Sequence, residues 1–104
     1  GGRFVLQAVD ADANALKALA TTIVSRGGLG AVLVSSARPS LLVIARAPDV
    51  AVSSSDVLAR LISKLGGRGG GRPDLAQGGG LDVPAEVILA EAREVLSRGP
   101  LNQS

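Results

Sequence analysis

The chain has 104 residues, a net charge of +2, and neither cysteine nor histidine. Without cysteine it forms no disulfide or thiolate metal site, and without histidine it has no imidazole base and no nitrogen ligand for zinc. No apolar run approaches the roughly 20 residues that cross a bilayer. We therefore expect no catalytic activity, no cofactor and no membrane segment in these residues.

The first third of the chain predicts a strand followed by a helix. Residues 3–9 (RFVLQAV) are apolar and rich in β-formers, which is typical of a strand. Asp10 and Asp12 come next, where helix capping is a better interpretation than metal binding. Gly27 is expected to end the helix in a left-handed conformation. The apolar face, at helical spacing, is Leu16, Leu19, Ala20, Ile23 and Val24.

Two short apolar runs predict a hairpin. AVLVSS (31–36) and LLVIARA (41–47) are nearly all apolar, and Pro39 favours a tight turn between them. Arg38 and Arg46 flank these strands. Surface solvation explains both arginines, although Arg38 would join a basic surface if the turn lay near one.

Two more helices are predicted downstream. Ser53 and Asp56 have capping-box spacing, and Gly66 can end the helix that they begin. The last helix starts near Pro84, a favoured first-turn residue, and stops at Gly99. Their apolar stripes are Val57, Leu58, Leu61, Ile62 and Leu65 in the first, and Ala85, Ile88, Leu89, Ala92, Val95 and Leu96 in the second.

The order β-α-β-β-α-loop-α defines the expected fold class. It predicts an α/β (α+β) fold, in which about three helices pack on a small mixed β-sheet as a two-layer sandwich. Residues 1–98 are expected to form a single globular domain and residues 99–104 a C-terminal tail. Because every apolar stripe is needed for one small core, we expect a monomer.

A glycine-rich stretch, GGRGGGRPDLAQGGG, occupies residues 66–80, and eight of its fifteen residues are glycine. It contains neither G-x-x-x-x-G-K-[ST] nor G-x-G-x-x-G, and it follows a helix instead of a strand, so these two routes to nucleotide binding are excluded. Two interpretations remain: a flexible linker, or a backbone surface that a ligand approaches closely. Exposed glycine N–H groups and forked arginine donors both suit phosphate oxygens.

A local basic stripe runs into this stretch. No acid occurs between Asp56 and Asp74, and cations recur there every four residues at Arg60, Lys64, Arg68 and Arg72. A solvated helix face accounts for the charge equally well. Together with the glycines, however, the stripe favours a partner with a polyanionic backbone. Charge recognises phosphates and not bases, so RNA and DNA both remain candidates.

Residues 66–80 resemble the C-terminal globular (C-Ala) domain of alanyl-tRNA synthetases, a DHH-associated domain shared with certain phosphoesterases. The matching pattern is a helix ending in Gly-Gly, then Gly-Gly-Gly-Arg-Pro-Asp, an apolar residue, Ala-Gln and a second glycine run. The resemblance implies a domain that grips the elbow of alanine tRNA and assists aminoacylation and editing. It implies a nucleic-acid surface at Gly69, Gly70, Gly71 and Arg72, to which the charge pattern adds Arg60, Lys64 and Arg68, with Asp74 stabilising the loop.

The resemblance leaves other functions open. The alternatives are the substrate-binding domain of a DHH-family phosphoesterase, which would prefer short single strands or mononucleotides, and a general DNA- or RNA-binding module. ATP, magnesium and zinc are implied only for a parent synthetase. The GGGRPD version is similar to bacterial-type or organellar enzymes, which points to an intracellular protein of the mitochondrial matrix or the cytoplasm.

Overall fold

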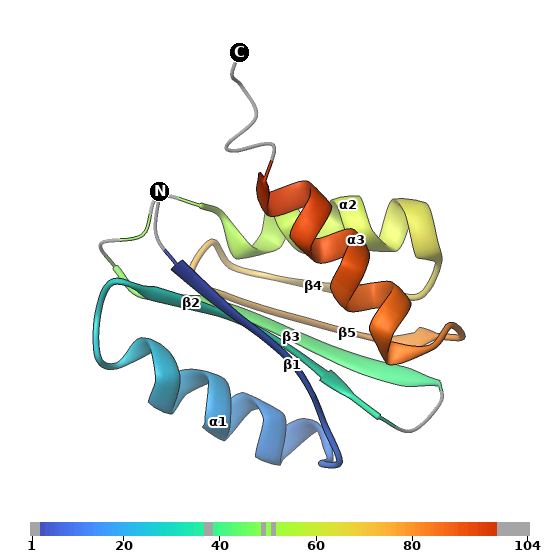
Figure 1. The fold of residues 1–104 in the computed structure, drawn as a ribbon, viewed down its shortest axis with the longest axis horizontal. Coiled ribbons are helices and arrows are strands. Elements are labelled where there is room, and N and C mark those ends of the chain that lie inside the picture. The colour runs from blue at the N-terminus through green and yellow to red at the C-terminus, as the bar shows by residue number, and fades with distance from the viewer. Residues whose placement is uncertain (1–2, 37–38, 49, 51, 98–104) are drawn as a thin grey trace.

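The computed structural model describes residues 3–36, 39–48, 50 and 52–97. The strands in this part of the chain form one mixed sheet in the order β1-β2-β3-β5-β4, in which β1 is parallel to β2 and all other neighbours are antiparallel (Figure 1). In chain order the elements are β1 (Arg3–Val9), α1 (Ala13–Val24), β2 (Leu29–Ser35), β3 (Ser40–Arg46), α2 (Ser54–Leu65), β4 (Arg68–Gly71), β5 (Leu75–Leu81) and α3 (Ala85–Ser97).

Helices cover both faces of the sheet. α1 packs on β2 and β3 from one side, whereas α2 and α3 pack on the other side (Figure 1). The mixed sheet and the three helices are confirmed, but the number of layers is three and not the expected two. None of these helices is both long enough and apolar enough to cross a membrane.

The two-sided burial explains why the central strands are apolar throughout. Successive side chains of a strand point to opposite faces. Val32 and Ile44 therefore pack toward α2 and α3, and Leu33 packs toward α1. A strand buried on both faces shows no alternation of polar and apolar residues. The continuous apolar runs of β2 and β3 therefore indicated helices on both faces of the sheet.

The expected helix caps are confirmed. The carboxylate of Asp12 accepts a hydrogen bond of 2.9 Å from the amide of Ala15, at the start of α1. The hydroxyl of Ser53 accepts a bond of 3.4 Å from the amide of Asp56, at the start of α2. Gly27 has the expected positive φ, 77°, but α1 already ends at Val24 with Ser25 as its C-cap.

A few expectations differ from the structure or fall outside it. Leu19 was expected on the buried face of α1 but is 41% exposed, because it lies at the margin of the face that carries the buried Leu16 and Ala20. Arg38, the stop at Gly99 and the tail at 99–104 lie outside the described residues.

The glycine-rich stretch is a β-hairpin and not a loop. β4 and β5 pair with each other, and β5 also pairs with β3. Backbone bonds in both directions between Arg72 and Leu75, of 2.9 and 3.2 Å, close the turn. Glycine is depleted in strands because it offers no side chain to pack. The sequence pattern therefore did not predict β4 and β5. Tertiary contacts supply the order instead, since Ala76 and Leu81 are buried beneath α2 and α3.

Candidate nucleic-acid interface

The hairpin places its glycines and arginines at the exposed edge of the sheet. β4 is the outermost strand, and all four of its residues are exposed. Strand residues alternate between faces, so Arg68 and Gly70 share the face on which α1 lies, and Arg72 directly follows the end of the strand. The register agrees, because Arg68 pairs with Gly79 and Gly70 pairs with Gln77 on that face.

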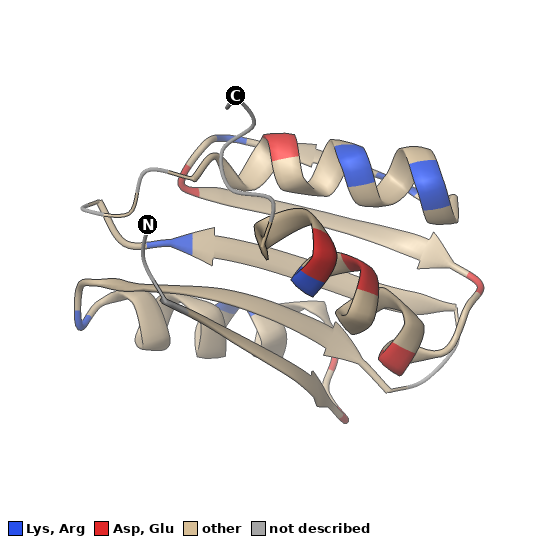
Figure 2. Cartoon of the chain, turned by 45° about the horizontal axis from the view of Figure 1, so that its top comes forward, with Lys and Arg blue, Asp and Glu red and all other residues tan. Residues whose placement is uncertain are grey.

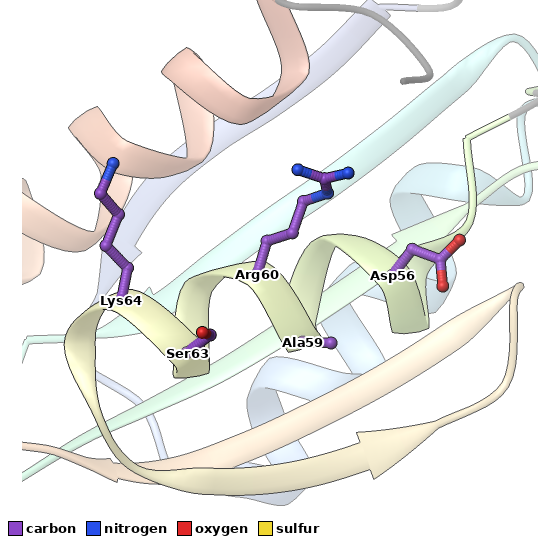
Figure 3. A pocket seen from close by; sticks show the side chains of 5 residues that line it. All are labelled: Asp56, Ala59, Arg60, Ser63 and Lys64. Atoms are coloured by element: carbon purple, nitrogen blue, oxygen red, sulfur yellow. The ribbon is translucent and has the colours of Figure 1, made fainter. Parts of the chain in front are cut away.

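The four cations of the predicted stripe form two separate groups. Arg60 and Lys64 extend from α2, where they line an open hollow of about 670 Å³ together with Asp56 (Figure 3). Arg68 lies across the sheet from them, and Arg72 lies in the turn of the hairpin. The four cations are evenly spaced in the sequence, but the change from helix to strand after Gly66 moves Arg68 and Arg72 away from the α2 cations.

The α2 group is partly neutralised by acids from a distant part of the sequence. Lys64 Nζ lies 3.0 Å from Glu91 Oε2 of α3. α3 packs beside α2 and carries two further acids, Glu86 and Glu94; the acids of this helix are red in Figure 2. Among the described residues, no side chain pairs with Arg60 or Arg68. Each group therefore keeps one cation with no described side-chain partner, and the hairpin is the stronger anion-binding candidate because its own ion pair, between Arg72 and Asp74, is longer (3.5 Å against 3.0 Å) and more exposed.

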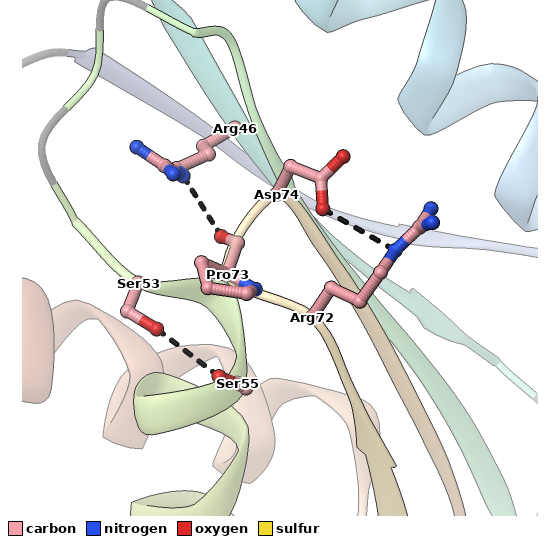
Figure 4. A network of polar contacts seen from close by, with 6 residues as sticks. All are labelled: Arg46, Ser53, Ser55, Arg72, Pro73 and Asp74. Carbon is pink, nitrogen blue, oxygen red and sulfur yellow. Dashed lines mark hydrogen bonds and ion pairs between the residues drawn. The ribbon is translucent and has the colours of Figure 1, made fainter.

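Asp74, which the resemblance expects to stabilise the loop, lies beside the other hairpin arginine. Its Oδ1 is 3.5 Å from Arg72 Nε (Figure 4). Both side chains are well exposed, and exposed ion pairs contribute only about 0–1 kcal/mol. The pair orients Arg72 without withdrawing its remaining donors from solvent.

Arg46 holds the hairpin turn in place, a role that sequence reasoning missed. Its Nε donates to the carbonyl of Pro73 at 2.8 Å, and its Nη1 donates to the carbonyl of Val50 at 2.5 Å (Figure 4). The same Pro73 carbonyl accepts a bond of 2.8 Å from the amide of Ser54. The interpretation of Arg46 as a solvated surface residue is wrong. The available signal was its place between two apolar alanines inside the run LLVIARA.

The three glycines of β4 differ in the space that surrounds them. A Cβ at Gly69 would meet the backbone of β5, 2.5 Å from the Cα of Gly78. A Cβ at Gly71 would lie 2.5 Å from the Cα of Ala76. A Cβ at Gly70 has nothing within 4 Å. Close approach within the hairpin thus accounts for Gly69 and Gly71, whereas Gly70 faces open space.

This difference predicts a contrast in stability. Gly69→Ala is expected to destabilise the domain by about 1–3 kcal/mol, the usual cost of overpacking. Gly70→Ala should stay within about 0.5 kcal/mol of the wild type, as surface substitutions do. Urea unfolding of both variants measures the contrast. Equal midpoints would show that the hairpin backbone relaxes around a Cβ at Gly69.

The described residues hold no group of three or more His, Cys, Asp or Glu side chains that could bind a metal ion. The sheet edge presents exposed backbone and cations, so fold and site together define an α+β domain with a glycine–arginine hairpin at its edge. The DHHA1 domain family matches residues 1–98. The chain belongs to that family.

Known relatives and a solved structure agree with this family. The chain is 39% identical over 83 residues to an alanine–tRNA ligase of Methanoculleus marisnigri and 37% identical over 91 residues to one of Methanoregula boonei. These matches span 80% and 86% of this chain but only 9% and 10% of those proteins. The crystal structure of the C-Ala domain from Aquifex aeolicus alanyl-tRNA synthetase superposes with a TM-score of 0.75 and 25% identity, covering 96% of this chain and 90% of that one.

Proposed function

We propose that this chain is the tRNA-binding C-terminal domain of an alanine–tRNA ligase, which grips the elbow of alanine tRNA. The observation that carries the proposal is the match to alanine–tRNA ligases over 80% and 86% of this chain. The similarity to a C-Ala domain along nearly the whole chain supports the same conclusion. The domain would hold one tRNA while the full-length enzyme aminoacylates and edits it.

The hairpin edge supplies suitable chemistry for this role. Arg68 begins β4 and Arg72 directly follows its last residue, so the two arginines flank the exposed glycine backbone between them. Forked arginine donors match phosphate oxygens, and the open space at Gly70 lets a sugar-phosphate chain approach. Arg60 and Lys64 on α2 offer a second, weaker group of phosphate contacts.

The domain would act by binding, and its parent would supply the chemistry. ATP, magnesium and zinc belong to other parts of an alanine–tRNA ligase in this proposal. Such an enzyme works where tRNA is charged, in the mitochondrial matrix or the cytoplasm. We expect the isolated domain to be monomeric, because its apolar helix faces pack into its own core.

Competition between nucleic acids tests the proposal. The 104-residue domain is expected to bind folded alanine tRNA more tightly than a single-stranded RNA or DNA of equal length, as measured by fluorescence anisotropy. A preference for short single strands or mononucleotides would instead favour the phosphoesterase alternative. Equal affinity for tRNA and for duplex DNA would indicate a general nucleic-acid-binding module.

A further inference from the structure

Half of one sheet face is left uncovered beside the hairpin. α1 packs mainly on β2 and β3, and no helix of the described chain makes a comparable contact with β5 or β4 on that side (Figure 1). A groove of about 310 Å³ lies there, lined in part by Ala13 at the start of α1, Leu41, Gln77, Gly79 and Arg68. Ligand pockets span about 300–1,000 Å³, so this groove suits a small ligand such as a single heterocyclic base.

The groove exists because Gly79 has no side chain. Arg68 of β4 stands directly opposite Gly79. On the other side, the end of Leu41 would lie 3.1 Å from a Cβ at Gly79. Leu41 and Arg68 thus form two walls that stand two strand spacings apart, about 10 Å, with bare backbone as the floor between them.

The groove walls have the chemistry that a nucleobase requires. RNA-binding proteins stack unpaired bases on aromatic rings or on arginine guanidinium planes and bond their edges with polar side chains. The only aromatic residue of this chain, Phe4, packs against the core on the far part of the sheet. Arg68 and Leu41 are therefore the available surfaces for stacking. Gln77 is exposed, and its amide both donates and accepts hydrogen bonds.

We propose that this Gly79 groove receives one unpaired base of the bound nucleic acid, held between Leu41 and Arg68, with its edge hydrogen-bonded by Gln77. The identity of the ligand as a nucleic acid rests on the proposed function. The assignment makes Gln77 a residue that reads bases, whereas the hairpin arginines contact phosphates. Among the described residues nothing else engages the Gln77 side chain, so its amide is available for this contact.

Nuclear magnetic resonance tests the groove directly with the RNA tetranucleotide ACGU. The side-chain amide of Gln77 and the backbone amide of Gly79 are expected to shift during titration. Gln7 is an exposed glutamine of β1 at the opposite edge of the sheet, so its side-chain amide is an internal reference that should stay unshifted. A Gln77 shift no larger than that of Gln7 would overturn the inference.

Matched variants extend the test to tRNA. Gln77→Ala is expected to weaken tRNA binding about 2- to 12-fold, the effect of one hydrogen bond, and to leave binding of a fully paired RNA duplex unchanged. Gln7→Ala should change neither. Equal losses for tRNA and duplex would overturn a base contact by Gln77. If Gln77 responds to ACGU but wild-type protein shows no preference for tRNA, the groove stands and the proposed function fails.

Discussion

Arg46→Met is expected to destabilise the domain by about 2–4 kcal/mol, because it removes two hydrogen bonds donated by a charged group. Each such bond contributes up to about 3 kcal/mol. Methionine keeps much of the aliphatic stem, so the loss reports the guanidinium. The carbonyl of Val50 would lose its contact with Arg46, and that of Pro73 would keep only the amide of Ser54. Chemical denaturation of both proteins measures the difference.

A matched cation serves as the control for this variant. Arg60→Met removes an exposed guanidinium from α2, to which no described side chain is paired, and should change stability by about 0.5 kcal/mol or less. If Arg46→Met unfolds at the same urea concentration as Arg60→Met, the turn does not depend on Arg46. Arg46→Lys is expected to restore little, because a single ammonium group lacks the forked geometry that reaches two carbonyls.

The helices could be predicted from sequence because their signals are local. Asp12 and Ser53 cap helices within one turn of their own positions, and Gly27 has a positive φ three residues after Val24, where the apolar face and α1 end. The β4–β5 hairpin could not be predicted in this way. Its order depends on pairing with β3 and on burial of Ala76 and Leu81, which lie far from their partners in the sequence.

Only the residue types of the candidate site, and not their arrangement, could be predicted from the sequence. The glycines and arginines were visible, but a spacing of four residues suggested one continuous stripe. The structure separates Arg60 from Arg68 because the chain turns from helix to edge strand between them. The acids of α3 and the contact between Arg46 and Pro73 join segments that no local pattern connects.

Two substitutions at the hairpin edge are expected to weaken tRNA binding by different mechanisms. Arg72→Ala removes one phosphate contact, which should lower affinity about tenfold and flatten the log–log salt dependence by about 0.7–0.9. Its melting temperature should barely change, because the exposed pair with Asp74 contributes about 0–1 kcal/mol. Lys17→Ala, an exposed cation on α1, is the charge control and should leave the salt slope intact.

Gly70→Val separates close approach from charge. No atom lies within 4 Å of a Cβ at Gly70, so valine fits the folded domain and projects into the space where a bound sugar-phosphate chain would lie. Affinity for tRNA should fall about as much as in Arg72→Ala, while the salt slope stays that of the wild type because no charge is lost. Titrations at three salt concentrations distinguish the two variants. Wild-type binding by both variants would place the tRNA-binding surface away from the hairpin edge.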